Sequence, residues 1–121
     1  MYKIINNLIM ENKKKYILYI GEDKKVLEVL KQSENYQIEN ITNGFLFDIW
    51  TRKKIIPYII ISEMKLKGIN GILLHKEIQK YDNFSSVPFI LLYQNYTHDQ
   101  KLQALYLGID DIYKKPHFLK I

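Results

Sequence analysis

Charged residues follow the ends of three short apolar runs in this 121-residue sequence. Glu22 and Asp23 follow the first run, Glu63 follows another, Lys115 follows the last, and an intermediate run ends at Tyr93. Carboxylate and ammonium groups that meet at one place can pair with each other or bind a charged ligand. These residues are the first candidates for a functional site, provided that the fold brings them together.

The apolar runs predict the elements that would position these residues. We predict five strands, at 16–20, 36–41, 58–62, 87–93 and around Ile112 and Tyr113. Apolar residues at helical spacing predict four helices between them, at 24–32, 45–50, 72–78 and 99–107. Strands that alternate with helices in this way predict a parallel sheet with helices on both faces. Ligands of such sheets bind outside the carboxyl ends of the strands, which is where the candidate residues fall.

Within the predicted helices the spacing also indicates which side chains face the sheet. The second helix carries an apolar stripe of Phe45, Leu46, Ile49 and Trp50. The inner positions of the third include Ile72, Leu74, His75 and Ile78. Gly108 follows the fourth helix and is a natural C-terminal cap.

Composition excludes several classes of protein. The net charge is +5, but Arg52 is the only arginine and the lysines are spread along the chain. Clustered basic side chains with several arginines are typical of nucleic-acid binding, so we do not expect it through this domain. The absence of cysteine excludes disulfides and thiolate metal sites and fits the cytoplasm, where we expect the protein. No run approaches the roughly 20 apolar residues of a membrane helix, so we expect no membrane contact.

Four stretches, in order, resemble the receiver domain of bacterial response regulators. ILYIGED resembles its first strand with an acidic pair, and PYIIISEMKLKGINGI resembles its third strand with the phosphoacceptor and the loop that follows. VPFILLY resembles the fourth strand, and GIDDIYKKP resembles the fifth strand with its Lys-Pro pair. The resemblance implies an α/β, flavodoxin-like doubly wound fold with five parallel strands in the order 2-1-3-4-5.

The resemblance also sets the expected limits of the domain. Residues 16–121 would form the receiver-like domain, and residues 1–15 would be an N-terminal extension. We expect the family's final helix to be missing, because the sequence stops at Ile121, soon after Pro116.

The resemblance assigns a role to each candidate residue. Glu63 takes the place of the phosphoacceptor aspartate, and Glu22 and Asp23 form the acidic pocket. Lys115 and Pro116 keep the Lys-Pro pair as the family has it.

Two further positions correspond to the family's switch residues. Tyr93 stands where the family has a small hydroxyl residue, and Ile112 stands where it has an aromatic one.

Three departures from the family pattern predict that phosphoryl transfer is lost. Glu63 places its carboxylate one methylene further out than aspartate would, and small displacements cost large factors in rate. Gly21 replaces the first metal-binding acid and offers Mg²⁺ no carboxylate. Tyr93 puts a ring where a small hydroxyl would meet the phosphoryl oxygen. We therefore expect no cofactor and no bound metal, with Glu22 and Glu63 as the only side chains that could take part in Mg²⁺ binding.

The leading interpretation is a pseudo-receiver, a non-enzymatic signalling domain that acts by protein–protein contact without phosphorylation. The alternative is a divergent receiver that is still phosphorylated, on Glu63 or a neighbouring acid. A nucleotide-binding α/β domain is a third interpretation, but Gly21 stands alone where a glycine-rich phosphate loop would be. A basic DNA-binding module is the fourth.

Two interpretations of Glu63 stay open. Its charge either stands in for the phosphorylated state, reaching Lys115 and fixing one conformation, or is a solvated remnant. The expected partners are another protein or an output domain. We also expect self-association into a homodimer, which would cover the face that a missing final helix exposes.

Overall fold

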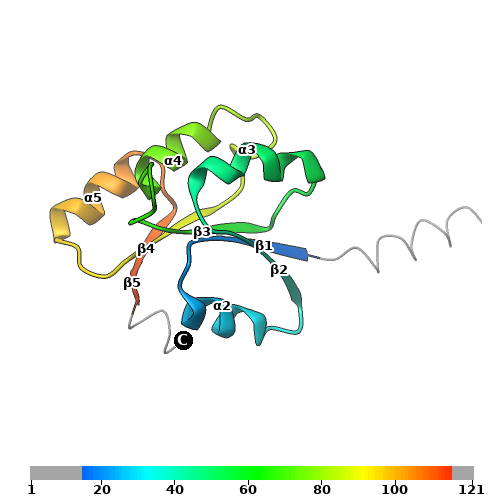
Figure 1. The fold of residues 1–121 in the computed structure, drawn as a ribbon. Helices are drawn as coiled ribbons and strands as arrows, with labels where there is room; N and C mark the ends of the chain where they lie inside the picture. Colours follow the sequence, from blue (N-terminus) through cyan, green and yellow to red (C-terminus); the bar gives the residue numbers. More distant parts are fainter. Residues whose placement is uncertain (1–14, 116–121) are drawn as a thin grey trace, which may run out of the picture.

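The computed structural model describes residues 15–115, which form one α/β domain (Figure 1). The elements are β1 (Lys15–Ile20), α2 (Lys24–Lys31), β2 (Tyr36–Ile41), α3 (Phe47–Trp50), β3 (Ile59–Glu63), α4 (Gly71–Ile78), β4 (Phe89–Tyr93), α5 (His98–Tyr106) and β5 (Asp111–Lys114). All strand pairs are parallel and the sheet order is β2-β1-β3-β4-β5. Helices α3, α4 and α5 cover one face and α2 covers the other. The predicted fold class and strand order are confirmed.

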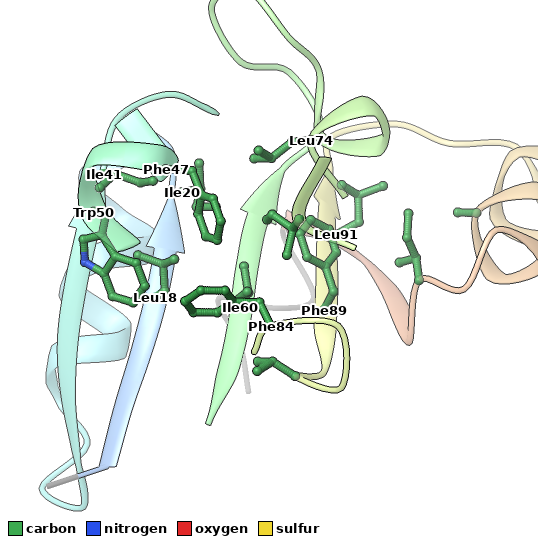
Figure 2. Close-up of a cluster of buried hydrophobic side chains, with 14 of the residues drawn as sticks. Leu18, Ile20, Ile41, Phe47, Trp50, Ile60, Leu74, Phe84, Phe89 and Leu91 are labelled. Carbon is green, nitrogen blue, oxygen red and sulfur yellow. The ribbon is translucent and has the colours of Figure 1, made fainter. Parts of the chain in front are cut away.

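Strand residues alternate between two apolar cores, one on each face of the sheet. The larger core lies under α3, α4 and α5 and includes Leu18, Ile60 and Leu91 (Figure 2). The smaller core lies under α2, where Ile61 and Leu92 meet the helix. Because both faces are covered, these strands are apolar at consecutive positions, which is why the sequence shows them as continuous runs.

Polar side chains fix the starts of the helices. Asn70 accepts a hydrogen bond from the backbone of Leu73 at the start of α4. Thr97 and Gln100 form a capping box at the start of α5. Gly108 follows α5 with φ +92°, which confirms its prediction as the residue that ends the helix.

The predicted second helix is wrong in its extent and in its buried face. The segment consists of a 3₁₀ turn at Gly44–Leu46, the four-residue α3 and a second 3₁₀ turn at Thr51–Lys53. Phe47 and Trp50 are buried, whereas Phe45 and Ile49 are 69% and 57% exposed. The predicted stripe assumed regular α-helical spacing, and the 3₁₀ turns rotate the side chains away from it. Of the inner positions predicted in α4, Leu74, His75 and Ile78 are buried and Ile72 is half-buried.

Some predictions fall on residues that the structure does not describe. These are Pro116, the missing final helix and most of the N-terminal extension, although β1 begins at Lys15, one residue before the predicted boundary of the domain. Among residues 15–115, none of the helices has the length and apolarity that crossing a bilayer requires.

Candidate functional site

Glu63 and Lys115 meet at the carboxyl edge of the sheet, as their positions predict. Glu63 is the last residue of β3 and is 7% exposed. Lys115 directly follows β5, and its Nζ lies 2.7 Å from Oε1 of Glu63. The two side chains reach each other over β4, which separates their strands in the sheet.

Asp23 completes a bridge on the other side of Lys115. Its Oδ2 lies 2.8 Å from Lys115 Nζ. Its Oδ1 accepts the backbone N–H of Lys25 at 2.9 Å, so the same carboxylate caps the N-terminus of α2. One lysine therefore joins two carboxylates, one at the end of β3 and one in the loop between β1 and α2.

The second oxygen of Glu63 is held by a residue that the sequence did not single out. Tyr19 lies in β1 and is fully buried, and its hydroxyl donates a 2.7 Å hydrogen bond to Oε2 of Glu63. The same hydroxyl accepts the backbone N–H of Asp23 at 3.1 Å. In the sequence Tyr19 is part of an apolar run and is typical of a core residue. Only its hydroxyl group, which needs a hydrogen-bond partner when buried, indicates that it could bind a carboxylate.

Gly21 makes the contact between Tyr19 and Glu63 sterically feasible. Side chains two residues apart on a strand share a face, so Gly21 lies beyond Tyr19 on the face that Glu63 also occupies. A Cβ at Gly21 would overlap Cγ of Glu63 and would lie 2.6 Å from the Tyr19 hydroxyl oxygen. The space of a side chain at position 21 is thus filled by the tyrosine and the longer glutamate.

The backbone around Gly21 is fixed by hydrogen bonds to the neighbouring strand. Its N–H donates to the carbonyl of Ile41 at 2.9 Å. The side-chain amide of Asn40 donates to the carbonyls of Tyr19 and Gly21 at 3.0 and 3.1 Å. These bonds hold the end of β1 in the position from which Tyr19 reaches Glu63.

The electrostatics of the site favour a protonated tyrosine beside charged partners. Burial, together with the hydrogen bond and charge of Glu63, raises the pKa of Tyr19 far above its ordinary value. The hydrogen bond from Lys115 lowers the pKa of the Asp23 carboxyl. Burial alone would lower the pKa of Lys115, but the hydrogen bonds and charges of Asp23 and Glu63 outweigh it and raise that pKa. At neutral pH Lys115 is therefore a cation held between two carboxylates.

A hollow of about 430 Å³ opens beside this network. Its lining includes Glu22, which is exposed, and two lysines of the loop after β3, Lys65 and Lys67. Among residues 15–115 no group of three His, Cys, Asp or Glu side chains is arranged to hold a metal ion. Mg²⁺ needs several oxygen ligands in near-octahedral geometry, and here both oxygens of Glu63 are bonded to Tyr19 and Lys115. The donor set does not fit a magnesium ion.

The side chains at the two predicted switch positions pack with the core under α3, α4 and α5. Tyr93 is the last residue of β4 and is half-buried. The centroid of its ring lies 5.9 Å from the centroid of the Tyr96 ring. Tyr93 is not among the residues that line the hollow. The β4 strand directs its side chain toward the core under α3, α4 and α5 instead. Ile112 is 1% exposed in the same core.

Comparison of the sequence with known proteins finds similar proteins but no matching family model. The phosphate regulon transcriptional regulatory protein PhoB of Rhizobium meliloti (strain 1021) is 25% identical over 101 residues, which cover 80% of this chain. The chain spans only 44% of that relative's length.

Solved structures match over most of the chain. The phosphorylated cyanobacterial phytochrome response regulator RcpA has a TM-score of 0.76 at 15% identity, covering 89% of this chain and 88% of that one. The chemotaxis response regulator CheY4 of Vibrio cholerae has a TM-score of 0.73 at 16% identity, covering 89% and 94%. A response regulator from Chloroflexus aurantiacus has a TM-score of 0.74 at 20% identity, covering 90% and 100%. These likenesses establish the fold.

Proposed function

We propose that this domain, which has the CheY-like receiver fold, is a pseudo-receiver that signals by protein–protein contact and has no phosphorylation cycle. One observation carries the proposal: both carboxylate oxygens of Glu63 are bonded within the protein, one to Tyr19 and one to Lys115. In this proposal the domain works beside an output domain or a separate protein of a two-component system, and it catalyses no reaction.

Phosphorylation would require a carboxylate oxygen free to attack phosphorus and a metal to neutralise the phosphoryl charge. Glu63 offers no free oxygen, and it is 7% exposed. Gly21 supplies no metal ligand, and the hydroxyl of Tyr19 occupies space beside it. Each defect weakens the reaction, and together they support loss of the whole cycle.

The same contacts support a fixed conformation of the domain. Glu63 carries its charge to Lys115, so a permanent ion pair joins the ends of β3 and β5. In a phosphorylated receiver, the charge at this place would come and go with the phosphoryl group. We infer that Glu63 keeps the domain in one signalling state. A buried ion pair of this kind fixes geometry more reliably than it adds stability.

The test is a heteronuclear NMR titration of the domain with Mg²⁺ and then with beryllofluoride, a phosphoryl mimic. We expect the amide resonances of Gly21, Glu63 and Lys115 to stay in place. The positive control is the response regulator Rcp1, whose solved structure holds Mn²⁺. The same titration of that protein should give metal-dependent shifts. Saturable shifts in the unaltered domain that spread to β5 would refute the proposal and favour a divergent, phosphorylated receiver.

The fixed conformation is tested separately with Glu63→Gln, which keeps the shape of the side chain and removes its charge. We expect the amide resonances of β5 and Lys115 to move and broaden, because Lys115 loses one of its two anionic partners. Unchanged β5 resonances would mean that Glu63 is a remnant without influence on conformation.

A further inference from the structure

A groove of about 300 Å³ is lined by residues of α3, of α4 and of the segments next to these helices. Its floor and walls include Phe47, Leu74 and Tyr81. We refer to it as the α3–α4 groove. It is separate from the hollow beside Glu63 and shares no lining residue with it.

The lips of the α3–α4 groove are apolar and exposed. Phe45 lines the groove and is 69% exposed. Ile49 and Leu73 are next in sequence to the lining residues Asp48 and Leu74, and they are 57% and 47% exposed. Leu73 and Glu77 are four residues apart on α4, so they lie on the same side of that helix. Apolar side chains gathered around a concavity mark a surface that binds an apolar partner.

The charges that line the α3–α4 groove are acidic. Asp48 and Glu77 both line it, and its lining contains no lysine or arginine. Asp48 accepts a 2.8 Å hydrogen bond from the Tyr81 hydroxyl, and Glu77 pairs with Lys80 at 3.0 Å outside the groove. A partner that enters the groove with apolar side chains and a neighbouring cation would match both features.

Helix α5 presents the complementary surface. Its inner side is anchored by Ala104, which is fully buried. Its outer side exposes Leu102, Leu105 and Tyr106, with 52%, 37% and 91% of their surface accessible. Lys101 lies one turn before Leu105 and places a cation beside these apolar side chains. This surface is convex, apolar and flanked by a positive charge.

We propose that the occupant of the α3–α4 groove is helix α5 of a second copy of this chain. The three helices lie in one layer in the order α5, α4, α3, so α4 separates the groove from the exposed side of α5 (Figure 1). The two surfaces therefore cannot meet within one molecule. Docking between copies continues the helical layer, with Lys101 of one copy facing Asp48 or Glu77 of the next.

Such a contact joins two different surfaces and is heterologous. A heterologous contact leaves one free groove and one free helix at the ends of each assembly, so the copies add head to tail. This inference rests on the exposed faces of α3, α4 and α5. It holds whether or not Glu63 can be phosphorylated.

The test is sedimentation velocity across a concentration series that reaches several hundred micromolar, on the full chain and three variants. Ile49→Glu places a charge on the groove lip beside the acidic lining. Tyr106→Glu places one on the outer side of α5. Ile56→Glu is the matched control, because Ile56 is an apolar residue of similar exposure, at 51%, on neither surface. All three positions are exposed, and a dispersed NMR spectrum checks that each variant is folded.

We expect the unaltered chain and Ile56→Glu to associate, and each of the other variants alone to sediment as a 14.5 kDa monomer. An equimolar mixture of Ile49→Glu and Tyr106→Glu retains one intact contact, between the groove of the second and the helix of the first. The mixture should therefore form a dimer of twice that mass and nothing larger. A monomeric unaltered chain overturns the proposal. A mixture that stays monomeric also overturns it. A loss of association in only one of the two variants overturns it as well, because this result indicates a symmetric contact through that surface alone.

Discussion

The hydroxyl of Tyr19 donates to Oε2 of Glu63 at 2.7 Å, although the two residues are 44 positions apart in the chain. The bond is formed on the face of the sheet covered by α2, where Tyr19 is paired with Ile61 and Glu63 is the next residue along β3 on that face. It leaves the carboxylate with no free oxygen once Lys115 is also bound. In the proposed pseudo-receiver, the loss of a reactive acceptor would therefore come from the packing of β1 against β3, as well as from a glutamate in the place of the family's aspartate.

Replacing Tyr19 with phenylalanine should destabilise the domain by about 1–3 kcal/mol, because Oε2 of the buried Glu63 and the N–H of Asp23 both lose their partner. The free energy of unfolding is measured by urea denaturation at pH 7. Tyr106→Phe is the control, since Tyr106 is 91% exposed. Equal stability of Tyr19→Phe and the unaltered domain would show that the hydrogen bond contributes nothing.

Replacing Gly21 with alanine should cost more than replacing Gly108 with alanine. Both glycines have positive φ, +156° and +92°, so both substitutions carry a backbone penalty of about 1–2 kcal/mol. Only at Gly21 does the added Cβ also overlap Glu63 and Tyr19, whereas at Gly108 the nearest atom is 3.7 Å away. Overlap in a packed site adds about 1–3 kcal/mol. Urea denaturation of the two variants gives the difference, and a Gly21→Ala variant as stable as Gly108→Ala would contradict the crowding.

Most of the fold follows from patterns that depend on local sequence alone. Continuous apolar runs locate β1, β3 and β4 within one or two residues of their observed ends. The parallel order then brings Glu63 and Lys115 to one edge, because the carboxyl ends of parallel strands coincide.

The parts that the sequence did not reveal depend on distances between strands. Whether the buried Tyr19 hydroxyl reaches the Glu63 carboxylate depends on the register of β1 against β3 and on the absence of a side chain at Gly21. A run of apolar residues in the sequence does not reveal the register. Tyr93 takes the place of the family's small hydroxyl residue, and the sequence does not show that alternation along β4 packs its ring against the core under α3, α4 and α5. Regular helical spacing misplaced Phe45 and Ile49 because the segment contains 3₁₀ turns.

The ion pair between Asp23 and Lys115 predicts a loss of stability in acid. Lys115 lowers the pKa of Asp23 in the folded state below its unfolded value of about 3.9. The unfolded chain therefore binds a proton more readily, and the stabilisation from Asp23 is present above pH 4 to 5 and disappears as the pH falls through the folded pKa. Asp23→Asn keeps a residue that caps α2 and removes the charge. The stability difference between the unaltered domain and Asp23→Asn should shrink between pH 6 and pH 3 in urea denaturation. A difference that is constant over this range would show that the pair is not coupled to folding.

Buried His75 predicts a second, separate pH dependence. The centroid of its ring lies 4.9 Å from the centroid of the Phe89 ring, and its Nδ1 has no hydrogen-bond partner among the described residues. Burial lowers its pKa, and the nearby charge of Asp110 opposes this only in part. Since the unfolded chain titrates near pH 6.5 and the folded protein resists protonation, the free energy of unfolding should fall as the pH is lowered below 6.5, by at most about 1.4 kcal/mol per pH unit.

The variant that isolates this effect is His75→Leu, which keeps an apolar side chain in the core and removes the titrating ring. Its stability should be nearly constant between pH 7.5 and pH 5.5, where the contribution of Asp23 does not yet change. His98→Gln is the matched control, because His98 is exposed at the start of α5 and its removal should leave the slope of the unaltered domain in place. Chemical denaturation at half-unit pH steps measures both slopes. If His75→Leu loses stability with falling pH as steeply as the unaltered domain, another group is responsible, and the folded protein admits a proton at His75 without penalty.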